Sequence, residues 1–311
     1  MTPTWLAAEE GGSFFMERQG SGRRAAHIQK SPSQKRGLGR LFSSAEMILV
    51  KKDMAGIWAK PSQRALLILL PAALVVVIPA VYFVAISLLP VEAGAKLPEA
   101  IAALASRPVE KLDYRQGWLT AFTDLLCPLL FLCVPVLTAA ASASYAFVAE
   151  RECGTLETLL LTTMDVKNVF NAKVTSCTIL SVFISGASFV AFAVTAIIAE
   201  IFTGAPPFFS WEWLVILVML TPVLSLFSVV FVAMIITRVH STGESLQTMG
   251  YLILPLAAAY LAQFTGIFRL NFLVLGAAAL VLGILAVVLF NMASRGFAPE
   301  KLLAEEDREA G

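Results

Sequence analysis

The stretch between residues 150 and 165 combines charged side chains with leucines at helical spacing. Leu156, Leu159 and Leu160 recur at positions i, i+3 and i+4, so in a helix they would share one face, with Glu157 on the opposite side. The chemistry that this pattern offers is docking: an apolar stripe with flanking charges, presented to a soluble partner. Periodicity alone fits an ordinary solvated loop equally well, and both interpretations stay open at this point.

The motifs of several enzyme classes are absent from the sequence. It contains no G-x-x-x-x-G-K-[ST] phosphate-binding loop, no H-E-x-x-H zinc motif and no G-x-S-x-G nucleophile motif. Its two histidines, His27 and His240, lie outside the apolar runs. The four cysteines show no C-x-x-C spacing, so we expect them to pack rather than to bind metal. We therefore predict no catalytic residue, no metal site and no cofactor bound by the chain itself.

Three carboxylates, Asp124, Glu200 and Glu212, lie at the edges of apolar runs. A charge at the bilayer centre costs at least about 2.5–3.5 kcal/mol on insertion scales, whereas a carboxylate at the edge of a span can stay hydrated. Asp124 could therefore line a transport pathway, or it could simply be solvated at the interface. Because no apolar run carries a buried charge relay, a proton-driven carrier is disfavoured.

The composition shows what kind of elements must position these residues. Apolar residues make up 58% of the 311 residues and charged residues 14%, against about 45–50% and about 25% in soluble domains. A soluble chain of this length has too little interior to bury so much apolar surface. These values exclude disordered, collagen-like and coiled-coil proteins, and they indicate an all-α polytopic membrane protein.

Six stretches of 24 to 26 residues contain no Asp, Glu, Lys, Arg or His. As a helix, each would extend about 36–39 Å, enough to cross a hydrocarbon core of about 30 Å. They must be helical because backbone polar groups in lipid need partners within the segment. The six predicted transmembrane spans are about 65–89, 125–149, 174–199, 213–237, 245–268 and 270–294.

Lysine and arginine side chains are divided unequally between the loops. If both termini are inside, 18 of them lie on the cytoplasmic side and 5 outside, which is the distribution that the positive-inside rule favours. We therefore predict cytoplasmic termini, with a six-helix domain over residues 61–296 and a cytoplasmic tail over 297–311. Between the first two spans, Pro98–Ala105 could form one short surface helix.

Residues 1–41 are basic and contain no apolar run typical of a cleaved signal peptide. We expect a disordered cytoplasmic tail near an anionic leaflet, although translation could instead start at Met16. Over residues 42–60 we predict an amphipathic, interfacial elbow helix that ends before Pro61 and places Trp58 at headgroup depth. The alternative is a helix that packs on a soluble partner.

The run from Glu150 to Thr162 resembles the signature of ABC-2 type permeases, E-R-E-x-G-T-L-E-x-L-L-x-T-P. These are the membrane subunits of a class of ATP-binding-cassette exporters. The run from Arg295 to Leu303 is similar to the family's R-x-F-x-x-E-x-L-L ending, whereas Thr163 stands where the family usually has proline. The matching residues of the coupling segment, 150–173, are Glu150, Arg151, Glu152, Gly154, Thr155, Leu156, Glu157, Leu159, Leu160 and Thr162.

This resemblance implies a permease subunit that forms a homodimer, or a heterodimer with a second permease, and that binds a separate ABC ATPase. The coupling segment would sit in a groove of that ATPase, which would bind Mg-ATP and hydrolyse it, so the chain itself is not expected to be an enzyme. The implied location is the plasma (inner) membrane of a prokaryote, with lipids as further partners and no nucleic acid. The alternative is a non-transport membrane sensor or assembly protein that docks a cytoplasmic partner.

The predicted topology can be tested by cysteine-accessibility labelling in a background without the four native cysteines. A probe at Lys111 should react from outside the cell, because this residue lies in the one sizeable external loop. Probes at Lys167 and Glu306 should react only after the membrane is permeabilised. External labelling at Lys167 would contradict six spans with both termini inside.

Overall fold

A computed structural model describes the helical part of the chain. Contacts divide the chain into two units, residues 1–41 and 42–311, and every helix described below belongs to the second unit. The described residues are 44–88, 90, 97–104, 112–148, 166–235, 249–265 and 272–296. Within these ranges all regular secondary structure is helical and there is no strand, as predicted.

Five helical stretches are long and apolar enough to cross a membrane, which is the character of a multi-pass membrane protein. They are Pro61–Leu88, Tyr114–Phe147, Asn168–Thr203, Trp211–Ile235 and Phe272–Ser294. They correspond to five of the six predicted runs. The other run, 245–268, is described in its middle as α13 (Met249–Phe264), a shorter apolar helix of 16 residues. That this run crosses the membrane therefore stays a prediction.

Several of the long stretches are built from more than one helical segment. The first consists of α2 (Pro61–Ala72), the π-helical turn η1 (Ala73–Val77) and α3 (Ile78–Leu88). The second consists of α5 (Tyr114–Leu125), α6 (Cys127–Ala143) and the π-helical turn η2 (Ser144–Val148). The others are α9 (Val166–Thr203), then α10 (Trp211–Val215), η3 (Ile216–Leu220) and α11 (Thr221–Ile235), and finally α14 (Phe272–Gly296).

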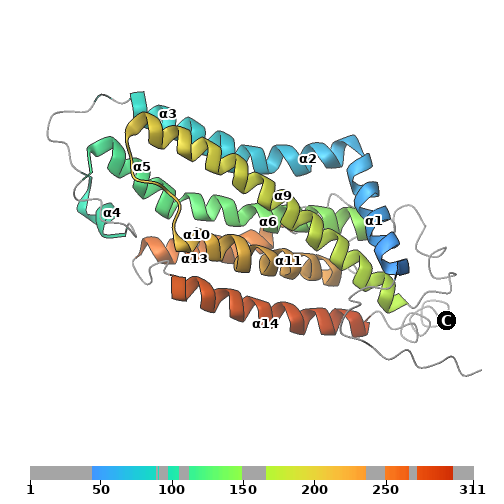
Figure 1. The fold of residues 1–311 in the computed structure, drawn as a ribbon. Coiled ribbons are helices and arrows are strands. Elements are labelled where there is room, and N and C mark those ends of the chain that lie inside the picture. The colour runs from blue at the N-terminus through green and yellow to red at the C-terminus, as the bar shows by residue number, and fades with distance from the viewer. Residues whose placement is uncertain are drawn as a thin grey trace, which may run out of the picture. The chain divides into compact units, whose positions relative to one another are not determined.

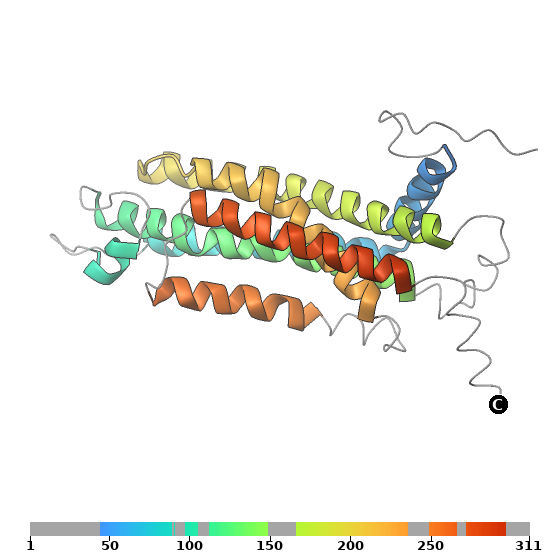
Figure 2. The same cartoon turned by 90° about the horizontal axis from the view of Figure 1, so that it is seen from below.

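The helix α6 lies at the centre of the bundle and packs against α9, α11 and α13 (Figure 1). In the most apolar part of Tyr114–Phe147, 78% of the residues are buried inside the protein, whereas in Phe272–Ser294 only 17% are. Figure 2 shows α13 as a separate rod at the side of the bundle and α14 lying across its front; α13 packs on α6 and α14 on α11. The core is therefore formed by α6, α9 and α11.

Two local predictions from the sequence are confirmed. Lys60 has extended backbone geometry and Pro61 begins α2, so the preceding helix ends where the proline was expected to stop it. The short helix expected over Pro98–Ala105 is present as α4 (Glu99–Leu104).

Two helices begin at least eight residues before the predicted spans. The second span was predicted to start at residue 125, but α5 begins at Tyr114, so that Asp124 lies inside a helix. The third was predicted to start at residue 174, but α9 begins at Val166, so that Lys173 lies inside it as well. A charged residue was taken as the end of a span, yet a charge alone does not stop a helix unless a cap, glycine or proline accompanies it.

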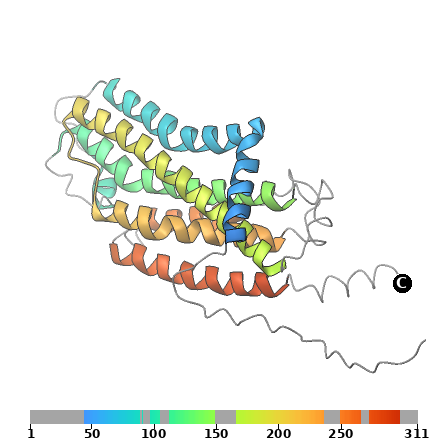
Figure 3. The ribbon, with the colours of Figure 1, turned by 45° about the vertical axis from the view of Figure 1, so that its right-hand side comes forward.

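A helix, α1 (Ser44–Ala59), covers most of the segment predicted as an elbow helix, and Figure 3 shows it lying across α9 rather than along it. Ile57 is buried and Met54 is half-buried, whereas Trp58 is exposed. The apolar face expected at the membrane or on a soluble partner therefore rests partly on the chain's own bundle. Contact of α1 with a membrane surface stays a prediction.

Two of the π-helical turns, η1 and η3, adjoin prolines within the long helices. At η1 the N–H of Ile78 reaches back to the carbonyl of Ala73, between Pro71 and Pro79. At η3 the N–H of Thr221 bonds the carbonyl of Ile216, and the Thr221 hydroxyl donates to the same carbonyl at 2.9 Å. Proline removes a donor from the helical ladder, and these shifted bonds keep the neighbouring backbone groups satisfied.

Hydroxyl groups join the three core helices near their middle. Thr138 on α6 lies 2.8 Å from Ser181 on α9, and Ser181 lies 3.1 Å from Ser225 on α11. Ser181 also donates to the carbonyl of Pro135 at 3.0 Å. All three hydroxyl residues are fully buried. Small side chains let the helices approach closely, and their hydroxyls bond across the contact, as is common in membrane proteins. We call Thr138, Ser181 and Ser225 the hydroxyl seam.

Because the hydroxyl seam is closely packed, we expect the stability of the protein to depend on the size of the side chain at position 181. Ser181→Leu should destabilise the protein by about 1–3 kcal/mol, because a larger side chain overpacks a close helix contact. Ser181→Ala should cost only about 0.6 kcal/mol, since Thr138 and Ser225 keep their bonds to the carbonyls of Val134 and Thr221. The measurement is the thermal unfolding midpoint of the purified protein in detergent.

The control is Ala187→Leu, the same increase in size at an exposed position of α9. Equal midpoints for the two leucine variants would contradict a tightly packed seam at Ser181.

Candidate functional site

The predicted coupling residues lie outside the described residues. The structure describes the helices that precede and follow them in the sequence. The helix before the segment ends with η2 at Val148, and the helix after it begins with α9 at Val166. Figure 1 shows that both flanks emerge at the end of the bundle where α1 lies. The residues outside the described part are Glu150, Arg151, Glu152, Gly154, Thr155, Leu156, Glu157, Leu159, Leu160 and Thr162.

A buried lysine joins these two flanks. Lys173 on α9 donates a hydrogen bond from its Nζ to the carbonyl oxygen of Ala146, in η2, at 3.1 Å. The same Nζ lies 5.8 Å from the centroid of the Phe147 ring, within range of a cation–π contact. Lys173 is only 4% exposed. Its charge lies at the C-terminal end of the α6–η2 helix, where carbonyl groups lack intrahelical donors and carry partial negative charge.

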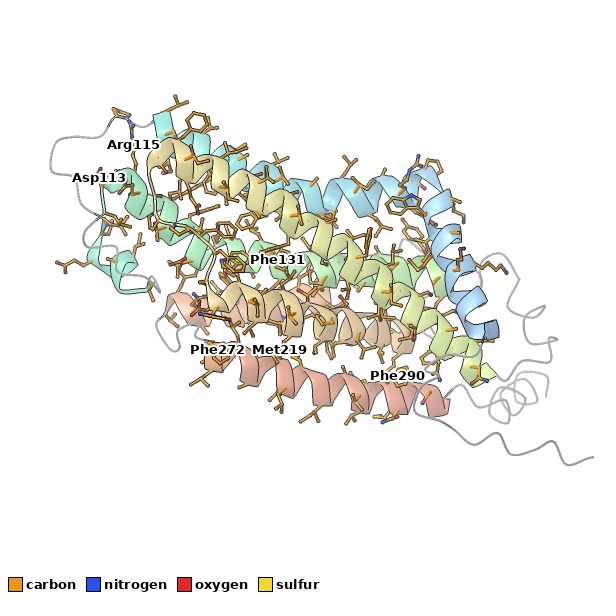
Figure 4. The ribbon with its side chains drawn as sticks, in the orientation of Figure 1. Asp113, Arg115, Phe131, Met219, Phe272 and Phe290 are labelled. Atoms are coloured by element: carbon orange, nitrogen blue, oxygen red, sulfur yellow. The ribbon has the colours of Figure 1, made fainter. Side chains whose placement is uncertain are left out.

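An aromatic contact chain extends this joint to the last helix. The ring of Phe147 lies 5.9 Å from that of Phe170 on α9, and Phe170 lies 6.1 Å from Phe290 on α14. Figure 4 labels Phe290 near the end of α14 that faces this region. The flanks of the coupling segment are thus held to each other by Lys173 and to α14 by aromatic packing.

The sequence alone did not place Lys173 in the core. It was assigned to the end of a cytoplasmic segment, because a charge next to an apolar run was read as a boundary. A lysine carries a long apolar stem, and it can bury that stem when its ammonium reaches a carbonyl at a helix end. The hydrogen-bond partner, Ala146, is 27 residues away in the sequence, so no local pattern could have identified it.

The carboxylates take different positions from one another. Asp124 is half-buried within α5, next to the point where that helix ends. It is therefore further inside the helical stretch than the span edge where it was predicted. Glu200 near the end of α9 accepts a hydrogen bond from the backbone N–H of Phe208 at 2.5 Å. Glu200 thus helps to fix the connection between α9 and α10, a structural use of the carboxylate.

An aromatic cluster lies between α6, α9 and α10 and was not anticipated from the sequence. Trp213 stacks on Phe192 at 5.1 Å and meets Phe131 edge-on at 6.0 Å. Phe208, in the connection before α10, contacts Phe192 edge-on at 5.4 Å. All four side chains are buried, and Figure 4 shows Phe131 inside the bundle. The cluster is a packed layer rather than an open binding site.

Groups that could hold a metal are not found in the described part of the chain, where no three His, Cys, Asp or Glu side chains gather. The cysteines described there, Cys127, Cys133 and Cys177, are all buried, as expected of packing residues. The arrangement in the described residues therefore offers helix joints and apolar packing, and the predicted coupling segment lies between η2 and α9 in the sequence.

No family model, no curated protein and no solved structure matches this chain. A function must therefore be inferred from the residues and from where the helices place them.

If the hydrogen bond between Lys173 and Ala146 holds the two flanking helices together, removing it should make the coupling segment easier to cleave by a protease. Lys173→Met removes the charged donor but keeps the length of the side chain, and hydrogen bonds to charged groups contribute about 1.5–3 kcal/mol. Cleavage at Glu150, Glu152 or Glu157 by a glutamate-specific protease should become about tenfold faster, because local opening of the flanks costs less. The measurement is the rate of limited proteolysis in detergent.

Lys60→Met is the matched control, since Lys60 is an exposed lysine between α1 and α2. Lys173→Arg, which keeps a charged donor, should restore most of the protection. Identical cleavage of Lys173→Met and the unchanged protein would show that this joint does not restrain the segment.

Proposed function

We propose that the chain is the membrane-spanning permease subunit of an ABC-2 type exporter, in the plasma (inner) membrane of a prokaryote. The observation that carries this proposal is the resemblance of residues 150–162 to the coupling motif, in a segment whose flanks emerge at one end of an apolar helical bundle. A second support is the joint between Lys173 and Ala146, which gives that segment a fixed mechanical connection to α6 and α9.

The proposed architecture has six spans with both termini in the cytoplasm. As described, α13 would extend about 24 Å at a rise of about 1.5 Å per residue, which falls short of a hydrocarbon core of about 30 Å. The charge-free run that contains it, 245–268, is long enough if helix continues at both ends. The excess of lysine and arginine in the loops assigned to the inside supports this orientation.

The proposed mechanism is alternating access driven by a partner ATPase. Two permeases would dimerise and bind two copies of the ATPase, whose closure on ATP would displace the coupling segments. The displacement reaches α6 and α9 together, since Lys173 joins them, and the hydroxyl seam links both to α11. A core joined in this way moves as a body, which suits rocking between inward-facing and outward-facing states. The permease itself breaks no bond.

The coupling segment carries the sharpest test. If Leu156, Leu159 and Leu160 insert into a groove on the ATPase, the double variant Leu159→Ala/Leu160→Ala should weaken association by about 1–3 kcal/mol for each leucine anchor. Glu157→Lys should weaken it further if the rim of the groove is basic. The measurement is co-purification of the ATPase encoded beside the permease gene, together with stimulation of its hydrolysis.

The control is Thr178→Ala, an alanine substitution within α9 that leaves the segment intact. Membrane insertion should be normal in all variants, because none alters the apolar character of a span. Undiminished ATPase capture and transport in the double variant would remove the main support for an exporter. Capture of a cytoplasmic partner that does not hydrolyse ATP would instead favour a membrane sensor or assembly protein.

A further inference from the structure

The second long helix is interrupted where α5 meets α6. Leu126 lies between the two helices, and Pro128 follows in the first turn of α6. Proline has no backbone N–H, so the helical ladder loses one bond at this step. The regular pattern is present on both sides: the N–H of Leu126 donates to Phe122 at 2.9 Å, and that of Leu130 donates to Leu126 at 3.2 Å.

The hydroxyl group of Tyr260 takes the place of the next backbone hydrogen bond, between Leu129 and Leu125. In an unbroken helix the N–H of Leu129 would donate to the carbonyl of Leu125. Here the N–H of Leu129 donates to the Tyr260 hydroxyl at 2.8 Å, and that hydroxyl donates in turn to the carbonyl of Leu125. A side chain from α13 is thus inserted into a backbone hydrogen bond of another helix, one of the known causes of a helix kink.

We infer that Tyr260 is a positioning residue that holds the junction of α5 and α6 open, and that this junction closes when α13 moves away. Tyr260 is buried, so no water is at hand to replace its hydroxyl. If α13 withdraws, the N–H of Leu129 and the carbonyl of Leu125 must find new partners, and the nearest partner of each is the other. Departure of α13 and closure of the ladder are then one event, which gives the junction two discrete arrangements.

The inserted hydroxyl matters beyond the junction because α5 is connected to α9. Gln116, near the start of α5, donates from its side-chain amide to the carbonyls of Thr203 and Gly204, each at 3.1 Å. These carbonyls belong to the end of α9, where Gly204 adopts a positive φ of 67°. A change in the direction of α5 is therefore transmitted to the connection between α9 and α10. This inference does not depend on the proposed exporter function.

The test measures the distance between α5 and α13 by pulsed electron paramagnetic resonance on the purified full-length chain in lipid nanodiscs. Spin labels on an unnatural amino acid at Arg115 and Leu261, both exposed, leave the native cysteines in place. The unchanged protein should give one narrow distance distribution. Tyr260→Phe removes only the hydroxyl, so the ladder can close and α13 is released, and a second, resolved population should appear.

Two controls accompany this variant. Tyr251→Phe makes the same chemical change on the same helix at an exposed position, and its distribution should match that of the unchanged protein. A reference pair of labels at Ile179 on α9 and Val218 on η3, both exposed, should report an unchanged distance in every variant that keeps its fold. An unchanged distribution in Tyr260→Phe, with the reference pair intact, would overturn the inference.

A second variant covers the case in which Tyr260→Phe disturbs the reference pair. Pro128→Ala returns a backbone N–H to the ladder while Tyr260 stays in place, so it should shift the balance towards the closed junction. The same second population should then appear between Arg115 and Leu261. If Pro128→Ala leaves that distance unchanged, the junction is a fixed kink and Tyr260 does not control it.

Discussion

Backbone N–H and C=O groups in an apolar helix must find their hydrogen-bond partners within the protein, because lipid offers none. In this chain, prolines inside the long helices remove donors, and at three places the neighbouring hydrogen bonds are rearranged. Ile78 and Thr221 reach back one residue further than in an α-helix, and the Thr221 hydroxyl adds a second bond to the carbonyl of Ile216. At the α5–α6 junction the compensating group is the hydroxyl of Tyr260 on another helix. The same requirement thus produces local irregularities and a long-range contact.

The sequence predicts the middle of each helix better than its ends. Long apolar runs locate the five spanning stretches, because only a helix satisfies their backbone in lipid. The ends were misplaced at Asp124 and Lys173, since charge was used as a boundary while the helices continue past both residues. Pro61 was placed correctly because its effect on the preceding residue is local. Boundaries set by local sterics can be read from the sequence, whereas those set by distant partners cannot.

In the candidate site, too, local features can be predicted from the sequence and contacts between helices cannot. The leucine stripe of residues 156–160 is a periodicity and is visible in the sequence, whereas a partner for it is not. The Lys173 joint, the hydroxyl seam and the Tyr260 bridge each connect residues on different helices. Such contacts depend on which faces of the helices meet, and a hydroxyl at an apolar position gives no local sign of its partner. One serine in a span is as compatible with a bond to its own helix as with a bond across the bundle.

Two of the long-range polar contacts of the second long helix lie near the opposite ends of its α6–η2 part. Lys173 of α9 binds the carbonyl of Ala146 in η2, and Tyr260 of α13 binds at Leu125 and Leu129, where α6 begins. At a rise of about 1.5 Å per residue, about 30 Å of helix separates the two contacts. Between them α6 is fixed to α9 by hydroxyl bonds and close packing, so it can act as a stiff connector. A load applied near the coupling segment would reach the Tyr260 contact through this one helix. In the arrangement inferred for the closed junction, the Leu129 N–H and the Leu125 carbonyl pair with each other directly. At the other end the Lys173 ammonium is buried, so breaking its contact with the Ala146 carbonyl carries a desolvation cost. If the Tyr260 junction closes as inferred, the bundle rearranges at the end far from the predicted coupling segment, while the Lys173 contact holds the near end.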